Sequence, residues 1–240
     1  MYELVSVIIT TYKRPIEVLL RAIKSVLRQS YSNYELLIVN DNPEDLEGQA
    51  QIINIIKDLN DKRIKYLTYE SNQGSNYARN YGLYNSKGAY VAFLDDDDEW
   101  FPSKLEMQVN IMKENPQVGL VSCGFFISDG NKVIGEKKPE PLYDYSIDNL
   151  IVYNYIAGTS FPLLRKSVID EVGGFDTQMV SCQEYELWLR MREVCEFATV
   201  KNPLGVYYVS DDSVFRNNIK KYYAGDQRLI EKNIDLLKWN

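Results

Sequence analysis

The chain has 240 residues, 45% of them hydrophobic, which is enough to bury a sizeable core without a disulfide or a structural metal. Its formal charge of -7 and pI near 4.9 argue against a nucleic-acid-binding surface, which is normally basic. Histidine is absent, so a metal site must be built largely from oxygen ligands and a proton acceptor must be a carboxylate, Lys, Tyr, Cys or the substrate.

The cysteines and the apolar runs indicate a cellular location. Cys123, Cys182 and Cys195 have no C-x-x-C spacing and leave one thiol unpaired in any bridging scheme, which favours a reducing compartment. The N-terminus has no signal-peptide pattern, and no run reaches the ~18 apolar residues of a membrane span. We expect a cytoplasmic protein that is soluble, or at most peripheral to the inner membrane surface.

Strands and helices alternate through the first half of the chain. Apolar residues at helical spacing predict helices after each of the first three strands. This alternation favours parallel βαβ units, and therefore an α/β fold with a mainly parallel central sheet. The predicted strands are 5–9, 34–39, 64–69 and 90–94, and the helices follow Pro15, span 52–59 and span 74–85.

The second half has a less regular pattern. We expect the whole to form one domain, with residues 1–215 as its body and 216–240 as a C-terminal helix of the same domain. Residues 131–162 lack a period and are expected to form a long loop over one edge of the sheet. The remaining predicted elements are a helix after Pro102, a strand at 118–127, helices near 165–172 and from Gln183, and a helix within 216–239.

Polar segments follow three of the predicted strands: residues 10–14, Asp41, and the aspartates 95–98. Ligands bind at the carboxyl ends of parallel strands. The acidic run 95–99 directly after a buried strand needs a compensating charge, and Mg²⁺ or Mn²⁺ held by one or two carboxylates and diphosphate oxygens would supply it. On residue type alone, a solvated acidic turn is the alternative.

Four segments together resemble glycosyltransferase family 2, the inverting enzymes with the three-layer GT-A fold. They are residues 5–12, 72–82, 94–100 and 183–190. The resemblance implies a nucleotide-diphosphate sugar donor, UDP-linked, and an acceptor hydroxyl on a glycan or lipid-linked oligosaccharide. It also implies Mn²⁺ or Mg²⁺ as cofactor and a single displacement that inverts the anomeric configuration.

The resemblance assigns the nucleotide contacts residue by residue. Thr10 and Tyr12 match residues that hold a uracil-type base, by backbone contact and ring stacking, and Asp41 matches the acidic residue that bonds the base edge. Asn76 and Arg79 lie in the segment that closes over the nucleotide. Taken alone, Tyr12 is also compatible with ordinary loop packing. Asn76 and Arg79 are also compatible with the polar face of a helix N-terminus.

The acidic run receives separate roles from the same resemblance. Asp95 and Asp96 are expected near the ribose and diphosphate, and Asp97 matches the metal-binding aspartate. Asp98 is expected to cap the helix that follows. Many relatives add a late histidine ligand, for which residues 207–214 offer only Asp211, Asp212 or a water, and Arg216 is a further candidate contact to the diphosphate.

The general base is expected at Glu184, where the family usually has aspartate. A glutamate can still accept a proton from an acceptor hydroxyl. Glu184 could instead stabilise its helix N-terminus, and Glu186 is the alternative base. Glu186 also forms an i,i+4 pair with Arg190, which is worth about 0.3–0.5 kcal/mol on a surface.

Two other functional classes remain open. The histidine-free late segment and the Asp-to-Glu change would also suit a catalytically silent protein that binds a nucleotide sugar or glycan. A nucleotidyltransferase usually has a glycine-rich basic loop after its first strand, whereas residues 10–15 contain no glycine.

Overall fold

A computed structural model describes residues 3–138, 150–151, 153–209 and 219–235. Each apolar run expected to be a strand in the first half of the chain is one. The strands are β1 (Val5–Thr11), β2 (Tyr34–Asn40), β3 (Ile64–Thr68), β4 (Tyr90–Asp95), β5 (Glu99–Trp100), β6 (Val118–Ser128), β7 (Val133–Lys137), β8 (Leu163–Arg165) and β9 (Glu196–Tyr208). The helices are α1 (Ile16–Leu27), α2 (Leu46–Leu59), α3 (Ser75–Asn85), α4 (Lys104–Glu114), α6 (Lys166–Glu171), α7 (Gln183–Val194) and α9 (Ile219–Lys232).

The described strands form one sheet in the order β3-β2-β1-β4-β8-β6-β9-β5, with β7 paired to β6. The first four strands of that order run parallel to one another, and β6 and β9 are also parallel. Short antiparallel pairings through β8 join these two parts. The sheet is therefore mainly parallel, as the sequence predicts, and it is curled.

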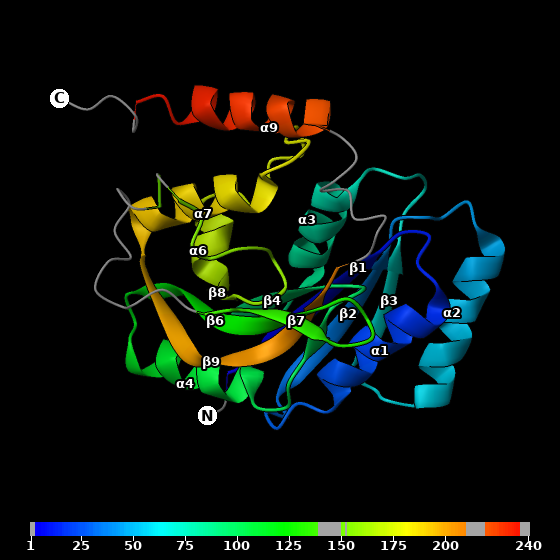
Figure 1. Ribbon diagram of the computed structural model, residues 1–240. Helices are drawn as coiled ribbons and strands as arrows, with labels where there is room; N and C mark the ends of the chain where they lie inside the picture. The colour runs from blue at the N-terminus through cyan, green and yellow to red at the C-terminus, as the bar shows by residue number, and fades with distance from the viewer. Residues whose placement is uncertain (1–2, 139–149, 152, 210–218, 236–240) are drawn as a thin grey trace.

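Successive side chains of each buried strand face two different cores. On β1, Val7 and Ile9 belong to the core that α1, α2 and α4 also line, whereas Ile8 belongs to the core on the opposite face, which α3, α6, α7 and α9 line. Figure 1 shows the two helix layers on either side of the sheet. This is the expected three-layer arrangement.

The prediction of a long loop over residues 131–162 is partly wrong. Val133–Lys137 forms β7, which pairs antiparallel with β6 beyond a tight turn at Gly130. Residues 139–149 and 152 lie outside the described part of the chain. β5, β8 and β9 are strands that the sequence pattern does not predict.

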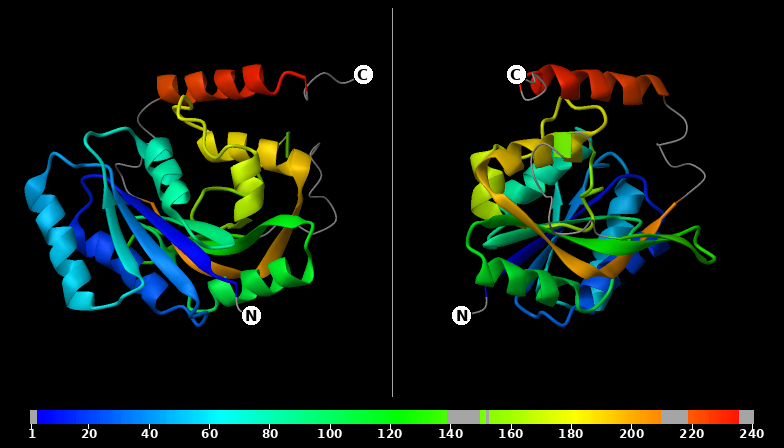
Figure 2. Two further views of the ribbon diagram at one scale, coloured as in Figure 1. Left: turned by 180° about the vertical axis from the view of Figure 1, so that it is seen from behind. Right: turned by 60° about the vertical axis from the view of Figure 1, so that its left-hand side comes forward.

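The C-terminal helix α9 lies on the outer side of the layer formed by α3, α6 and α7, as both views in Figure 2 show. Leu229 attaches it to the core on that side of the sheet. The described stretch of this helix is shorter than the expected 216–239. None of the helices in the described ranges is both long and apolar enough to cross a lipid bilayer.

Candidate functional site

The carboxyl ends of β1, β2 and β4 meet at one edge of the sheet. Thr10 is in register with Asp95 across the β1–β4 pairing. The backbone N–H of Asp41 donates to the carbonyl of Thr11 at 2.9 Å. The three polar segments that follow these strands are therefore brought together, which is the arrangement from which parallel sheets bind ligands.

Asp41 is buried and holds the turn that starts α3. Its Oδ1 accepts hydrogen bonds from the Tyr69 hydroxyl at 2.7 Å and from the Gln73 N–H at 2.8 Å. Its Oδ2 accepts from the N–H of Gly74 at 3.0 Å. Gly74 has φ +88°, a conformation that favours glycine. Asp41 thus shapes the 72–74 turn, and its expected contact with the base edge remains a prediction.

Tyr12 lies at the exposed end of the β1 loop, with 47% of its surface accessible. The Nζ of Lys13 is 5.0 Å from the centre of its ring. Beside it, a cleft is lined by polar and basic side chains that include Lys13, Arg14, Asn40 and Asn42. The ring is accessible enough to stack on a planar group, and the charge of Lys13 beside it would attract phosphate.

Arg14 compensates two of the aspartates in the acidic run. Its Nε donates to Oδ1 of Asp96 at 2.7 Å, and its Nη2 is 2.9 Å from Oδ2 of Asp97. Burial raises the pKa of Asp96 to about 6, against the opposing charge of Arg14. The sequence analysis identifies residues 10–14 as a polar segment after the first strand, but it predicts no role for Arg14 itself.

Arg79 lies on the first turns of α3 and is buried. Its Nη2 forms an ion pair of 2.8 Å with Oδ1 of Asp95, whose carboxylate also accepts from the Thr159 hydroxyl at 3.3 Å. The Nε and Nη1 atoms of Arg79 are buried and have no hydrogen-bond partner among the described residues. Two donors of a buried cation are therefore available at this point.

Glu184 is the second residue of α7, just after the left-handed Cys182. Burial raises the pKa of the Glu184 carboxyl; its own backbone N–H and the charge of Arg79 act in the opposite direction, and the charge of Asp95 adds to the rise. The structure therefore brings Glu184 within electrostatic range of Arg79 and Asp95. A carboxylate with a raised pKa is better suited to accept a proton near neutral pH than an exposed one.

Asp98 is not a helix cap. α4 begins at Lys104, and its N-cap position is Ser103. Asp98 is fully buried, and its Oδ1 accepts from the backbone N–H of Tyr208 at 3.1 Å. Burial, followed by the charge of Asp95, raises its pKa well above the usual value. The β5–β9 pairing, which the sequence does not predict, brings Tyr208 to this carboxylate.

Tyr207 is a site residue that the sequence reasoning misses. Burial, and then the negative charges of Asp98, Asp95, Asp97 and Glu184, raise the pKa of its hydroxyl to about 12. Its ring packs near Phe125, with the centroids 6.1 Å apart, and its hydroxyl lies within electrostatic range of these carboxylates. The sequence did point to this region, because Tyr207 is the first residue of the segment 207–214, where many relatives have a late histidine ligand.

The carboxylates of Asp95 and Asp97 suit a divalent cation that also keeps phosphate and water ligands. Burial and the neighbouring charge of Asp95 raise the pKa of Asp97, so the two carboxylates repel one another. Within the described ranges, no three Asp, Glu, Cys or His side chains form a complete metal cluster. Mg²⁺ sites with phosphate ligands need only one or two carboxylates. Asp211, Asp212 and Arg216 lie outside the described residues.

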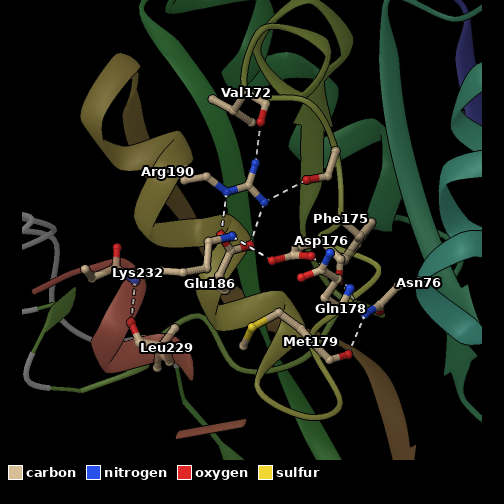
Figure 3. A network of polar contacts seen from close by, with 12 residues as sticks. Asn76, Val172, Phe175, Asp176, Gln178, Met179, Glu186, Arg190, Leu229 and Lys232 are labelled. Atoms are coloured by element: carbon tan, nitrogen blue, oxygen red, sulfur yellow. Dashed lines mark hydrogen bonds and ion pairs between the residues drawn. The ribbon is translucent and has the colours of Figure 1, made fainter. Parts of the chain in front are cut away.

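Asn76 and Glu186 both form contacts that the sequence does not predict. The Nδ2 of Asn76 donates to the carbonyls of Asp176 and Met179 at 2.9 and 3.0 Å, whereas its Oδ1 has no partner among the described residues, and its expected contact with the nucleotide stays a prediction. Glu186 is 1% exposed, and its ion pair with Arg190 is buried, not a surface pair. Figure 3 shows both contacts in one polar network.

Comparison with known proteins gives a consistent result. The family model described as "Glycosyl transferase family 2" matches residues 6–173. The chain is similar to the UDP-Glc:alpha-D-GlcNAc-diphosphoundecaprenol beta-1,3-glucosyltransferase WfgD of Escherichia coli, with 29% identity over 220 residues that cover 91% of this chain and 82% of WfgD.

Two solved structures share the fold. TarS 1-349 of S. aureus in complex with UDP-GlcNAc has a TM-score of 0.73 at 16% identity, over 95% of this chain and 66% of that one. The mannosyltransferase PcManGT of Pyrobaculum calidifontis, in complex with GDP-Man and Mn2+, has a TM-score of 0.73 at 16% identity, over 96% and 64%. The chain thus spans about two thirds of the length of these two structures, and the likeness confirms the three-layer fold.

Proposed function

We propose, from the premise that this chain belongs to glycosyl transferase family 2 and has the GT-A fold, that it is an inverting, metal-assisted glycosyltransferase. The donor is a nucleotide-diphosphate sugar, UDP-linked. The acceptor is a hydroxyl of a glycan or lipid-linked oligosaccharide. The observation that carries this proposal is that Arg79, which pairs with Asp95 at the end of β4, also lies within electrostatic range of Glu184.

On the donor side, we assign the nucleotide to the edge formed by the ends of β1, β2 and β4. The exposed ring of Tyr12 offers a stacking surface for a base, and Thr10 and the buried Asp41 lie at the same edge of the sheet. Lys13 and Arg14 supply positive charge next to it. UDP as the nucleotide is supported by the names of two similar proteins, one acting on UDP-Glc and one crystallised with UDP-GlcNAc.

Asp97, with Asp95 beside it, is the residue that we assign to the metal. A bound Mn²⁺ or Mg²⁺ would neutralise the charge that develops on the departing diphosphate. Arg14 pairs with both Asp96 and Asp97, but the side chain of Asp97 is 30% exposed and that of Asp96 only 7%, so Asp97 is the more accessible of the two to a cation. The Mn2+ in the PcManGT complex supports this assignment.

Glu184 is assigned as the general base. It accepts the proton of the acceptor hydroxyl while the acceptor oxygen bonds to the anomeric carbon and the bond from that carbon to the diphosphate oxygen breaks. One displacement transfers the sugar and inverts the configuration, so no covalent enzyme intermediate forms. The buried Nε and Nη1 donors of Arg79 have no partner among the described residues, and an oxygen of the donor or acceptor would satisfy them.

The lipid-linked acceptor rests on the similarity to WfgD, whose name specifies a diphosphoundecaprenol-linked sugar. A direct test is to incubate the purified chain with a panel of UDP- and GDP-linked sugars, Mn²⁺, and an undecaprenyl- or shorter polyprenyl-diphosphate sugar. Metal-dependent release of UDP together with an extended, inverted product supports the proposal. Nucleotide binding with no product from any donor would instead indicate the silent binding protein.

A further inference from the structure

Residues 175–182 form an irregular segment that leads directly into α7 and ends two residues before Glu184. Any displacement of this segment would therefore displace Glu184. The segment includes the left-handed residue Cys182 at the N-cap position of α7, where no side-chain cap fixes the helix end. Its position must be set by contacts with other elements.

One side of the segment is held by α3. The amide of Asn80 bonds both the carbonyl and the N–H of Phe175, at 2.7 and 2.8 Å. One turn earlier, Asn76 bonds the carbonyls of Asp176 and Met179. α3 is also the helix that carries Arg79, so these amides fix the segment relative to the cation that acts on Glu184.

The opposite side is held by α9, more than 40 residues further along the chain. Arg228 donates to Asp176 at 3.0 Å and to Gln178 at 2.7 Å, and Lys232 donates to Asp176 at 2.9 Å. Burial alone would raise the pKa of Asp176. The bonds from Lys232, the Gln178 N–H and Arg228 outweigh that effect and lower its pKa to about 2. Figure 3 shows Lys232 reaching towards both Asp176 and Glu186.

Gly225 gives independent support for close packing between α9 and the segment. A Cβ at this position would lie 1.9 Å from the Ser181 hydroxyl and 2.8 Å from its carbonyl oxygen. Glycine inside a helix costs about 0.5–1 kcal/mol relative to alanine, so its presence needs a reason. The reason here is that α9 lies directly against the backbone at residue 181, one residue before the left-handed Cys182.

Lys232 also joins the segment to α7 itself. It forms an ion pair with Glu186, whose carboxylate is buried and is shared with Arg190. Arg190 in turn bonds the carbonyl of Gly174 at 2.7 Å, just before the segment begins. One lysine therefore neutralises a carboxylate on each side of Glu184, at positions 176 and 186.

We propose that α9 is a clamp that holds the 175–182 segment against α3, and that Lys232 is the positioning residue through which it fixes Glu184. This inference rests on the proposed role of Glu184 as the base. Lys232 does not touch substrate. It acts by holding the carboxylate of Glu184 at a constant distance from Arg79 and the acceptor oxygen.

The test compares Lys232→Met with Lys220→Met, a control that removes the same charge from an exposed position on the same helix. A misplaced catalytic group costs rate with little effect on donor binding, so kcat of Lys232→Met should fall by about tenfold or more, with the donor KM within about twofold. The acid limb of its pH–rate profile should also move, because burial and Arg79 set the pKa of Glu184. Lys232→Arg should restore both.

Hydrogen exchange on the same variants provides a readout that needs no substrate. Amides of residues 175–186 should exchange faster in Lys232→Met than in wild type or Lys220→Met, while those of β1 and β4 stay protected. If Lys232→Met does not fold, Asp176→Asn weakens the same clamp from the other side and should give the same results.

Wild-type kcat and an unmoved acid limb in Lys232→Met, or unchanged exchange at 175–186, would overturn the proposal. If the wild-type chain transfers no sugar but exchange at 175–186 still rises in Lys232→Met, the proposed function fails and the clamp stands as a structural feature.

Discussion

Arg79 on α3 donates a hydrogen bond of 2.8 Å to Asp95 at the end of β4, and the same guanidinium acts electrostatically on Glu184 at the start of α7. Arg79 thus links Asp95, on the side of the site that we assign to the donor, with Glu184, the base that we expect to act on the acceptor hydroxyl. The Asp95 side chain is 35% exposed, so solvent screening keeps the contribution of this contact to stability below that of a fully buried ion pair.

Arg79→Met should move the acid limb of the kcat/KM profile to higher pH. The positive charge of Arg79 lowers the pKa of Glu184, so its removal raises that pKa, and the base becomes protonated at a higher pH. Profiles of wild type, Arg79→Met and the charge-conserving Arg79→Lys, measured at saturating Mn²⁺, would show the shift in the Met variant. An acid limb at the wild-type pH in Arg79→Met would contradict the assignment of Glu184.

Asp97→Asn should abolish the part of nucleotide affinity that depends on Mn²⁺. The substitution removes the carboxylate that we assign to the cation and leaves the proposed contacts of Tyr12 and Lys13 with the nucleotide in place. Calorimetry with UDP should show affinity at least about tenfold weaker than wild type in Mn²⁺, about 1.4 kcal/mol, and no difference in EDTA. Asp58→Asn, at an exposed position on α2, is the matched control. Equal affinity of both variants in Mn²⁺ would exclude Asp97 as the ligand.

Lys104 should give the protein an unusual gain in stability at alkaline pH. Its side chain is fully buried, 2.8 Å from Oε1 of Gln108 and 3.9 Å from the centre of the Trp100 ring. Burial lowers its pKa to about 8. Between that value and the unfolded pKa, the unfolded chain binds the proton and the folded chain does not, so folding becomes more favourable as pH rises.

Urea unfolding checks this expectation. Relative to Lys104→Met, wild type should gain about 2 kcal/mol between roughly pH 7 and pH 9.5. Lys57→Met, on the exposed face of α2, should follow wild type at both values. A constant difference between wild type and Lys104→Met across this range would show that Lys104 keeps its ordinary pKa in the folded protein.

The first half of the fold could be predicted because its strands are short, mainly apolar runs that alternate with helices. β9 could not, because Lys201, Asn202 and Pro203 break its alternation, and its register with β6 shifts at three points. β8 has only three residues and shows no period, although it joins the two parallel parts of the sheet.

The site was predictable where strand ends carry carboxylates, and not where distant segments complete it. Tyr208 meets Asp98 across 110 residues of sequence, and this contact turns an expected helix cap into a buried carboxylate. Lys232 meets Glu186 across 46 residues, and this turns an expected surface pair into a buried network. Local spacing contains no information about either contact. The contacts of Thr10, Tyr12 and Asp41 with a nucleotide remain predictions.

The most direct test of the central claim is the turnover of Glu184→Gln with a working donor and acceptor. The substitution keeps the size of the side chain and removes the proton-accepting charge, so turnover should fall by about 10²-fold or more while the Kd for UDP and Mn²⁺ stays at the wild-type value. Glu193→Gln, exposed on the same helix, should keep wild-type turnover. Wild-type turnover in Glu184→Gln, with only a lowered Tm, would contradict the account and reduce Glu184 to a helix-terminal charge.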